Sequence, residues 1–241
     1  MSSVFNGDQI IEPINTFGVK CSVLGNHDLD FGEEKCIELN EKCNFPWILT
    51  NCRKADGSQI ANTLKHWTFE HDGIKIGVMG LAEEDWIVTL GCFDPEDIIY
   101  DDFLKSAEET GRYLKEEEKC DFIVALTHMR IPNDDLLAEK GKNFDIILGG
   151  HDHCYYLNQS GENLVVKSGA DYRNLSKVTI EVKDKPSDVT YQADPVNTGD
   201  AVTGQDYHYY IKNKYKVTVM KYDVTNQIKR NDYLHNFVED Y

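Results

Sequence analysis

The sequence is short of basic side chains, and this shortage limits what the protein can bind. Its 241 residues contain 25 Lys and Arg but 42 Asp and Glu, so the formal net charge is −17 at pH 7. Nucleic acids and anionic membrane surfaces are held mainly by Lys and Arg. We therefore expect no nucleic acid and no anionic membrane among the partners of this chain.

Long apolar runs are also lacking. No run approaches the ~20 residues that a helix needs to cross a bilayer, so no membrane span is expected. The chain opens at Met1 without the basic and apolar segments of a signal peptide. As it stands, the chain is expected to be cytoplasmic. If an N-terminal segment is missing, an extracellular or secretory location is the alternative, because a signal peptide would be lost with that segment.

Several signatures of other protein classes are missing as well. The seven cysteines are odd in number and no two have C-x-x-C spacing, which argues against a disulfide framework and a structural zinc cluster. The sequence has no P-loop and no G-x-G-x-x-G, so neither of these phosphate cradles is expected. It also has no G-x-S-x-G, which excludes a hydrolase built on that nucleophile turn.

The hydrophobic residues that are present, 41% of the chain, suffice for a packed core, and their pattern predicts an α/β fold. In the first three-fifths, short apolar runs alternate with helical patterns, which is typical of a parallel or mixed sheet covered by helices. Asp72-Gly73 is a hairpin-turn signal between two of these runs. Strands are predicted at 19–24, 47–50, 63–70, 74–81, 122–126 and 145–148, and helices at 33–43, at 101–119, and from Asn133, as the N-cap, to Gly141.

The pattern changes at about residue 154, where short alternating runs and polar turns predict antiparallel strands. No internal repeat and no low-complexity tract is present. We therefore predict one domain, 1–241, in which a mixed α/β half at about 1–153 leads into an antiparallel half at about 154–241. The later strands are predicted at 154–157, 164–167, 177–182 and 215–222, with a loop at 193–207 and a final helix at 232–241.

Side chains that bind metal ions gather in three short segments, each directly after a predicted buried strand. Because ligands of open α/β sheets bind beyond the carboxyl ends of the strands, these segments are expected to meet at one edge. Imidazole and amide or carboxylate oxygens suit Zn, Mn or Fe, and two such ions ~3.5 to 4 Å apart can clamp a phosphate and activate water. The segments 25–32, 127–128 and 149–153 supply Asn26, His27, His128, His151 and His153.

These segments resemble the motifs of one enzyme superfamily. Gly25-Asn26-His27-Asp28 is similar to the G-N-H-D/E motif of calcineurin-like metallophosphoesterases. Leu126-Thr127-His128 resembles their single-histidine motif, and Gly150-His151-Asp152-His153 resembles their G-H-x-H motif. The segment 25–32, followed by Phe45-Pro46-Trp47, is similar to the 5'-nucleotidase branch. The resemblance implies a four-layer α-β-β-α sandwich of two mixed sheets flanked by helices.

The resemblance also implies a cofactor and its ligands. Family members use two divalent metal ions, such as Zn, Mn or Fe. In this chain Asn26, His128 and His151 would hold one of them, and His153 would help to hold the other. The implied reaction is hydrolysis of a phosphate monoester by a metal-bound hydroxide, and the implied substrate is a small phosphorylated molecule, most simply a nucleotide.

Two further residues receive catalytic roles from the resemblance. His27 would lie beside the metals without binding them, where it would stabilise the phosphoryl oxygens or protonate the leaving alkoxide. Asp30 would orient His27 through a hydrogen bond. The alternative for Asp30 is an N-cap of the helix that begins near Glu33.

The chain departs from the family pattern at its beginning. Family members open with a D-x-H strand end and then a G-D motif, whose carboxylate bridges both metals, and no D-x-H precedes Asn26. Asp8 lies only 18 residues before Asn26, which is too short for the helix and strand that normally intervene. We therefore expect Asp8 in a helix away from the metals, the N-terminal strands to be missing and one metal site to be incomplete.

Three explanations of this departure remain open: a truncated gene model or clone, a natural isoform without activity, or an unusual ligand such as Asp28 or Asp152. Two functions follow from them. The first is a metal-dependent phosphate monoesterase resembling 5'-nucleotidases. The second is a catalytically impaired fragment, or a non-catalytic metal-binding or interaction module derived from the same fold.

Overall fold

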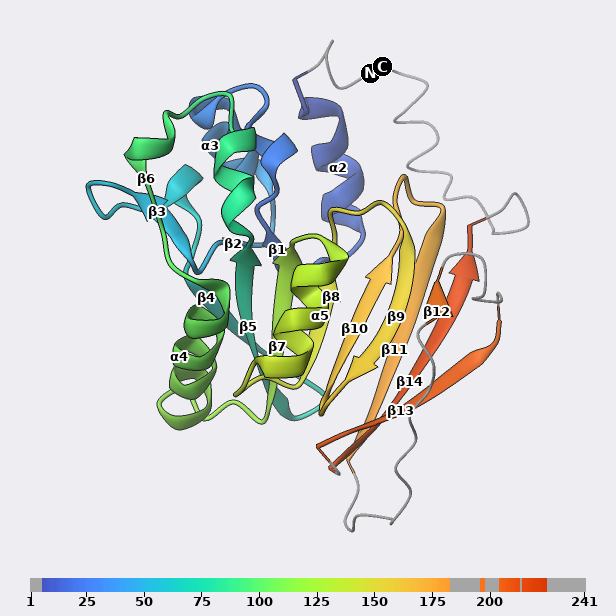
Figure 1. The fold of residues 1–241 in the computed structure, drawn as a ribbon. Helices are drawn as coiled ribbons and strands as arrows, with labels where there is room; N and C mark the ends of the chain where they lie inside the picture. Colours follow the sequence, from blue (N-terminus) through green and yellow to red (C-terminus); the bar gives the residue numbers. More distant parts are fainter. Residues whose placement is uncertain (1–5, 183–195, 198–203, 213, 225–241) are drawn as a thin grey trace.

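A computed structural model of the protein describes residues 6–182, 196–197, 204–212 and 214–224 (Figure 1). The helix predicted at 232–241 and part of the loop predicted at 193–207 lie outside these ranges. Within them, helices and strands alternate along the first part of the chain, and strands alone follow. The α/β class predicted from the apolar pattern is therefore confirmed.

A seven-stranded mixed sheet forms the centre of the molecule. Strands β5, β7, β8 and β10 are parallel neighbours, and antiparallel strands extend the sheet on both sides. Most residues of the central strands are buried, as expected where both faces of a parallel sheet are covered. The order is β12 (Val196–Asn197), β9 (Tyr155–Ser160), β10 (Asn163–Ser168), β8 (Ile146–Gly149), β7 (Phe122–His128), β5 (Ile74–Ala82) and β4 (His66–His71).

A second sheet of three strands packs on one face of the first. Its order is β11 (Asn174–Val182), β14 (Tyr215–Asp223) and β13 (Asp206–Ile211), and every pairing in it is antiparallel. The expectation of mixed pairing thus holds for the first sheet, whereas the described strands of the second are antiparallel. The register pairs Val178 with Val219 and Ile180 with Val217, so apolar side chains from neighbouring strands lie side by side, with Val217 and Val219 fully buried.

Alternate residues of the central strands supply two separate cores, because successive side chains of a strand point to opposite faces. Phe122, Ile146 and Leu164 face the second sheet and pack with Tyr215 and Val217. The intervening residues face helices α4 (Phe103–Glu116) and α5 (Ile131–Lys140), which cover the other face (Figure 1). Within the described residues, the layers are therefore helices, mixed sheet and antiparallel sheet.

Shorter elements surround the beginning of the chain. Helix α3 (Glu33–Lys42) buries Cys36 in a third core together with Leu24 and Leu49. None of the described helices is long and apolar enough to cross a bilayer. The remaining elements are α2 (Asp8–Thr16), β1 (Ser22–Val23) parallel to β2 (Trp47–Ile48), β3 (Cys52–Lys54) antiparallel to β6 (Ile98–Tyr100), and the 3-10 turns η1 (Asn26–Leu29), η2 (Ile60–Asn62), η3 (Glu84–Thr89) and η4 (Pro95–Asp97).

Three local predictions are confirmed and one is wrong. The Asp72-Gly73 turn has φ of 49° and 77°, which suits the primed turn of a hairpin, and Asp8 lies in helix α2. Asn133 is not an N-cap, because Pro132 favours the first turn of a helix and α5 already begins at Ile131. The antiparallel strand predicted at 164–167 is present, since β10 pairs antiparallel with β9, and it also pairs in parallel with β8 and so belongs to the first sheet.

Candidate metal centre

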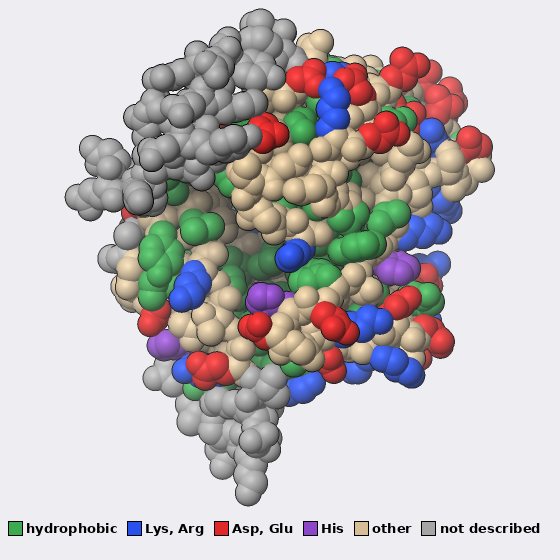
Figure 2. Space-filling view, turned by 180° about the vertical axis from the view of Figure 1, so that it is seen from behind, with side chains coloured by type: hydrophobic (Ala, Val, Ile, Leu, Met, Phe, Trp, Pro, Cys, Tyr) green, Lys and Arg blue, Asp and Glu red, His purple; other side chains and the backbone are tan. Residues whose placement is uncertain are grey.

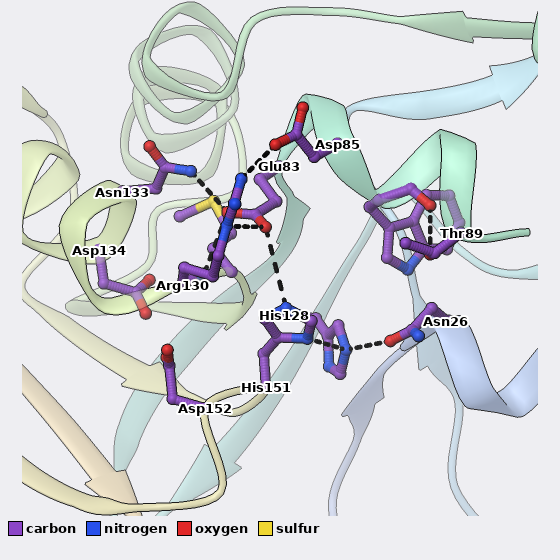
Figure 3. Close-up of polar contacts among 12 residues, drawn as sticks. Asn26, Glu83, Asp85, Thr89, His128, Arg130, Asn133, Asp134, His151 and Asp152 are labelled. Atoms are coloured by element: carbon purple, nitrogen blue, oxygen red, sulfur yellow. Dashed lines mark hydrogen bonds and ion pairs between the residues drawn. The ribbon is translucent and has the colours of Figure 1, made fainter.

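Three strand ends bring the predicted ligands together. Asn26 opens the turn η1 just after β1, and His128 is the last residue of β7. His151 follows two residues after β8, which runs parallel to β7 with Thr127 opposite Gly149. Because β1 packs against β7, the three side chains meet at one edge of the sheet (Figure 3).

The three side chains form a cluster of converging polar atoms. His128 Nε2 lies 2.8 Å from Asn26 Oδ1 and 3.0 Å from His151 Nδ1. A neutral imidazole carries one N–H, so His128 Nε2 can donate to only one of these two neighbours at a time. A cation bound between Asn26 Oδ1, His128 Nε2 and His151 Nδ1 would accept a lone pair from each of the three atoms. The donor set of two imidazoles and an amide oxygen fits a borderline divalent ion.

The cluster contains no carboxylate. Among the described residues, no group of three or more His, Cys, Asp and Glu side chains is placed to hold a metal ion. Asp28 Oδ2 accepts a hydrogen bond from Gly25 N at 2.7 Å, and Asp152 Oδ2 lies 2.6 Å from Lys167 Nζ. Both candidate substitutes for the missing carboxylate are thus engaged elsewhere, and the structure places neither of them in the cluster.

Burial keeps His128 neutral at pH 7. Desolvation, followed by the repulsion of His151 and Lys167, lowers the pKa of His128 from 6.5 to about 4. An uncharged imidazole is the form that binds metal ions. His128 can therefore bind a metal ion at neutral pH without first losing the proton of an imidazolium.

The lowered pKa predicts acid sensitivity of the metal-free protein. Between pH 6.5 and about 4 the unfolded chain binds a proton at His128 that the folded chain does not, so stability falls as the pH falls through this window. His128→Gln removes this titration, and its free energy of unfolding should fall less over the same range. Urea unfolding at pH 7, 5.5 and 4.5 measures the difference. An equal loss of unfolding free energy in both proteins would contradict the lowered pKa of His128.

The turn that carries His151 is strained. His151 and His153 have φ of 75° and 56°, in the left-handed region that non-glycine residues seldom occupy and that is common at functional sites. The turn is fastened by Gly150 N donating to Thr127 O at 2.9 Å. His153 is exposed at this turn, outside the Asn26–His128–His151 cluster.

The predicted catalytic pair lies on the neighbouring turn. His27 Nδ1 is 2.9 Å from Asp30 Oδ2, and the two side chains are 73% and 51% exposed. Both groups are thus accessible to a molecule in solvent beside Asn26. The alternative role of Asp30, an N-cap of the next helix, is wrong because Gly32 occupies the N-cap position of α3.

Three charged residues near the cluster were missed by the sequence analysis. Glu83 directly follows β5, and its Oε1 lies 2.7 Å from Arg130 Nε and 3.8 Å from His151 Nε2. Lys167 lies on β10 with its side chain 2% exposed. Glu83 obeys the same strand-end rule as His128, so the apolar run at 74–81 could have identified it.

A cavity extends from the cluster into the space between the sheets. It has a volume of about 300 Å³, and the residues that line it include Val23 of β1, Val178 of β11, His128 and Gly150. The reverse face of the molecule shows a hollow with hydrophobic side chains at its base and charges of both signs around it (Figure 2).

Comparison with known proteins identifies a matching family and similar phosphoesterases. Residues 6–155, more than half of the chain, match the model of the family described as calcineurin-like phosphoesterase. The chain is 33% identical over 174 residues to a 5'-nucleotidase of Vibrio cholerae serotype O1, covering 64% of this chain and 30% of that protein. It is 40% identical over 181 residues to the trifunctional nucleotide phosphoesterase protein YfkN of Bacillus subtilis, covering 62% of this chain and 12% of that protein.

The fold is shared with solved structures. The 5'-nucleotidase precursor from Thermus thermophilus superimposes with a TM-score of 0.75 at 15% identity, over 100% of this chain and 46% of that one. At this identity the likeness establishes the fold alone. The chain spans less than a third of the length of the two curated relatives named above.

Proposed function

The chain belongs to the calcineurin-like phosphoesterase family, and we propose that it is a metal-dependent hydrolase of phosphate monoesters whose substrates are nucleotides. The observation that carries the proposal is the convergence of Asn26 Oδ1, His128 Nε2 and His151 Nδ1 within 3.0 Å of their neighbours. The nucleotide substrate is inferred from relatives that are named as nucleotidases and that the chain covers only in part.

The protein's own residues would divide the work as follows. Asn26, His128 and His151 hold one divalent ion, and His153 contributes to a second. Such ions, when bound, neutralise phosphate charge and activate water. They also reconcile an anionic substrate with a chain of net charge −17. It stays a prediction that two ions bind and that they are Zn, Mn or Fe. The cytoplasmic location of the protein also stays a prediction.

His27 would act on the leaving group. Its imidazole is exposed beside the cluster, and Asp30 accepts a hydrogen bond from it at 2.9 Å. A carboxylate in that position stabilises the imidazolium and sets the ring orientation. The protonated ring can then donate its proton to the alkoxide that departs from phosphorus.

Replacing His27 by alanine should lower kcat for a nucleoside monophosphate by roughly 10²-fold, the typical contribution of a positioned acid. The loss should be smaller for p-nitrophenyl phosphate, because its acidic leaving group needs no proton. Manganese affinity should not change, since His27 lies outside the cluster. Steady-state hydrolysis and manganese titration of both proteins give the three quantities.

His71→Ala is the matched control for this experiment. His71 is an exposed histidine, 68% accessible, whose Nε2 lies 3.7 Å from the Asp72 carboxylate, at the far end of β5 from the cluster. It reproduces the chemical change without touching the site. Equal rates for the His27 variant and the wild type would refute the assigned role.

The same measurements separate the two functions. A wild-type chain that binds manganese but hydrolyses no phosphate monoester would be the non-catalytic metal-binding module. The absence of a carboxylate from the cluster, within the described residues, is the observation that favours this second function. Hydrolysis that requires manganese and disappears in cluster variants would establish the first.

A further inference from the structure

Lys167 is a buried lysine next to the proposed metal centre. It lies on β10 opposite Gly149 of β8, and its side chain is 2% exposed. Lysine is almost never fully buried unless it is paired. Its position therefore calls for an account of what it holds.

The ammonium group of Lys167 is saturated by groups from both histidine turns. Its Nζ donates to Met129 O at 2.7 Å, to Gly150 O at 2.7 Å and to Asp152 Oδ2 at 2.6 Å. These three acceptors match the three hydrogens of an ammonium group. The carboxylate of Asp134, itself fully buried, lies 2.6 Å away as a counter-ion (Figure 3 shows Asp134 and Asp152).

The acceptors are adjacent in the chain to the cluster residues. Met129 follows His128 directly, and Gly150 directly precedes His151. The pairing of β7 with β8 ends at Thr127 and Gly149. The turns that carry His128 and His151 begin at that point, where the sheet no longer aligns the two segments. Beyond that point, Lys167 donates to a backbone carbonyl of each turn.

We propose that Lys167 is a positioning residue that fixes the spacing of His128 and His151 by tying together the turns that carry them. The inference rests on the proposed metal centre but not on hydrolysis. Hydrogen bonds from a charged donor are stronger than those between neutral groups. Here they hold the turn in which His151 adopts a left-handed conformation. Loss of the tie lets the two rings separate.

The alternative to a positioning role is that Lys167 only neutralises the charge of Asp134. Two variants distinguish the roles. Asp134→Asn removes the buried counter-ion and keeps the Lys167 contacts with Met129 O and Gly150 O. The double variant Lys167→Met/Asp134→Asn removes the contacts and leaves no buried carboxylate at position 134 without its cation.

The first readout is the affinity for Co²⁺, followed by its absorption spectrum. The Asp134→Asn variant should bind Co²⁺ as the wild type does, although its Tm falls. In the double variant the Kd should rise about 10–100-fold, the range seen when an outer hydrogen-bond partner of a metal ligand is lost. Equal affinities in the two variants would show that Lys167 is only a counter-ion.

The second readout needs no metal. The rings of His128 and His151 lie 4.7 Å apart, centre to centre, which gives a nuclear Overhauser contact in the metal-free protein. The contact should persist in Asp134→Asn and vanish in the double variant, and its survival in the double variant would overturn the proposal. This readout stands even if the wild type hydrolyses nothing or binds no Co²⁺.

A measurement on the unaltered protein covers the case in which the double variant does not fold. Zn²⁺ bound to both turns should slow solvent exchange of the Lys167 ammonium protons, because it holds their acceptors in place. An exchange rate that is the same with and without bound Zn²⁺ would contradict the proposal.

Discussion

Replacing His128 by alanine should strongly weaken metal binding and, with it, hydrolysis of phosphate monoesters. His128 Nε2 contacts both other members of the cluster, at 2.8 and 3.0 Å. Its removal leaves an amide oxygen and one imidazole, which is too few donors for a tetrahedral or octahedral ion. We expect the manganese Kd to rise by at least about 10²-fold, beyond the 10–100-fold cost of losing an outer partner.

Calorimetric titration with manganese, together with the rate of nucleotide hydrolysis, tests this expectation. His208→Ala is the control, since His208 lies on β13 with its Nδ1 3.0 Å from Thr218 Oγ1. The circular dichroism spectrum of each variant checks that the fold is retained. Retention of wild-type manganese affinity by a folded His128→Ala variant would remove this residue from the proposed ligands.

Replacing Gly25 by alanine should disrupt the same cluster from the backbone. A Cβ at this position would lie 2.8 Å from His128 Cε1 and 2.9 Å from His128 Nδ1, closer than carbon and nitrogen atoms can approach. Gly25 has an extended conformation, with φ of −100° and ψ of 172°, so the strain is steric and not conformational. The glycine of this motif is required because the His128 ring packs directly on it.

The expected result is loss of stability and of activity together. Overpacking typically costs about 1–3 kcal/mol, and a displacement of about 1 Å at a catalytic group can lower the rate by 10²-fold. Thermal unfolding and manganese-dependent hydrolysis measure the two effects. Gly91→Ala is the control, because nothing lies within 4 Å of a Cβ at that position.

A second glycine near the cluster sharpens the comparison. A Cβ at Gly150 would lie 3.7 Å from His128 Nδ1, which is an ordinary contact. The Gly150→Ala variant should therefore lose less activity than Gly25→Ala, although both glycines adjoin a cluster residue. The opposite ranking would show that something other than the crowding of His128 makes Gly25 necessary.

The sequence predicted the elements that carry the site, because periodicity and turn signals are local. The apolar run at 122–126 became β7, the pattern at 33–43 became α3, and the Asp72-Gly73 turn closed its hairpin. The strand-end rule placed Asn26, His128 and His151 at one edge, and their atoms do meet there. The three motifs that carry the family resemblance lie within residues 6–155, which the family model matches.

The sequence did not predict which neighbouring charges complete the surroundings of the cluster. Asp28 and Asp152 are as close to the ligands in the chain as any carboxylates, yet one caps Gly25 N and the other pairs with Lys167. Glu83 and Lys167 come from other strands and reach the two histidine turns across the sheet. No local pattern distinguishes these acids from one another.

By itself, the sequence determined the strands, the helices and the donor types at each strand end, since burial periodicity and turn chemistry depend on residues a few positions apart. Only the tertiary structure decided that Asn26 and His128, 102 residues apart, approach within 2.8 Å, whereas His153 stays exposed nearby. The physical reason is that side-chain convergence depends on how β1 packs against β7 and on how the buried Lys167 ties the turns together.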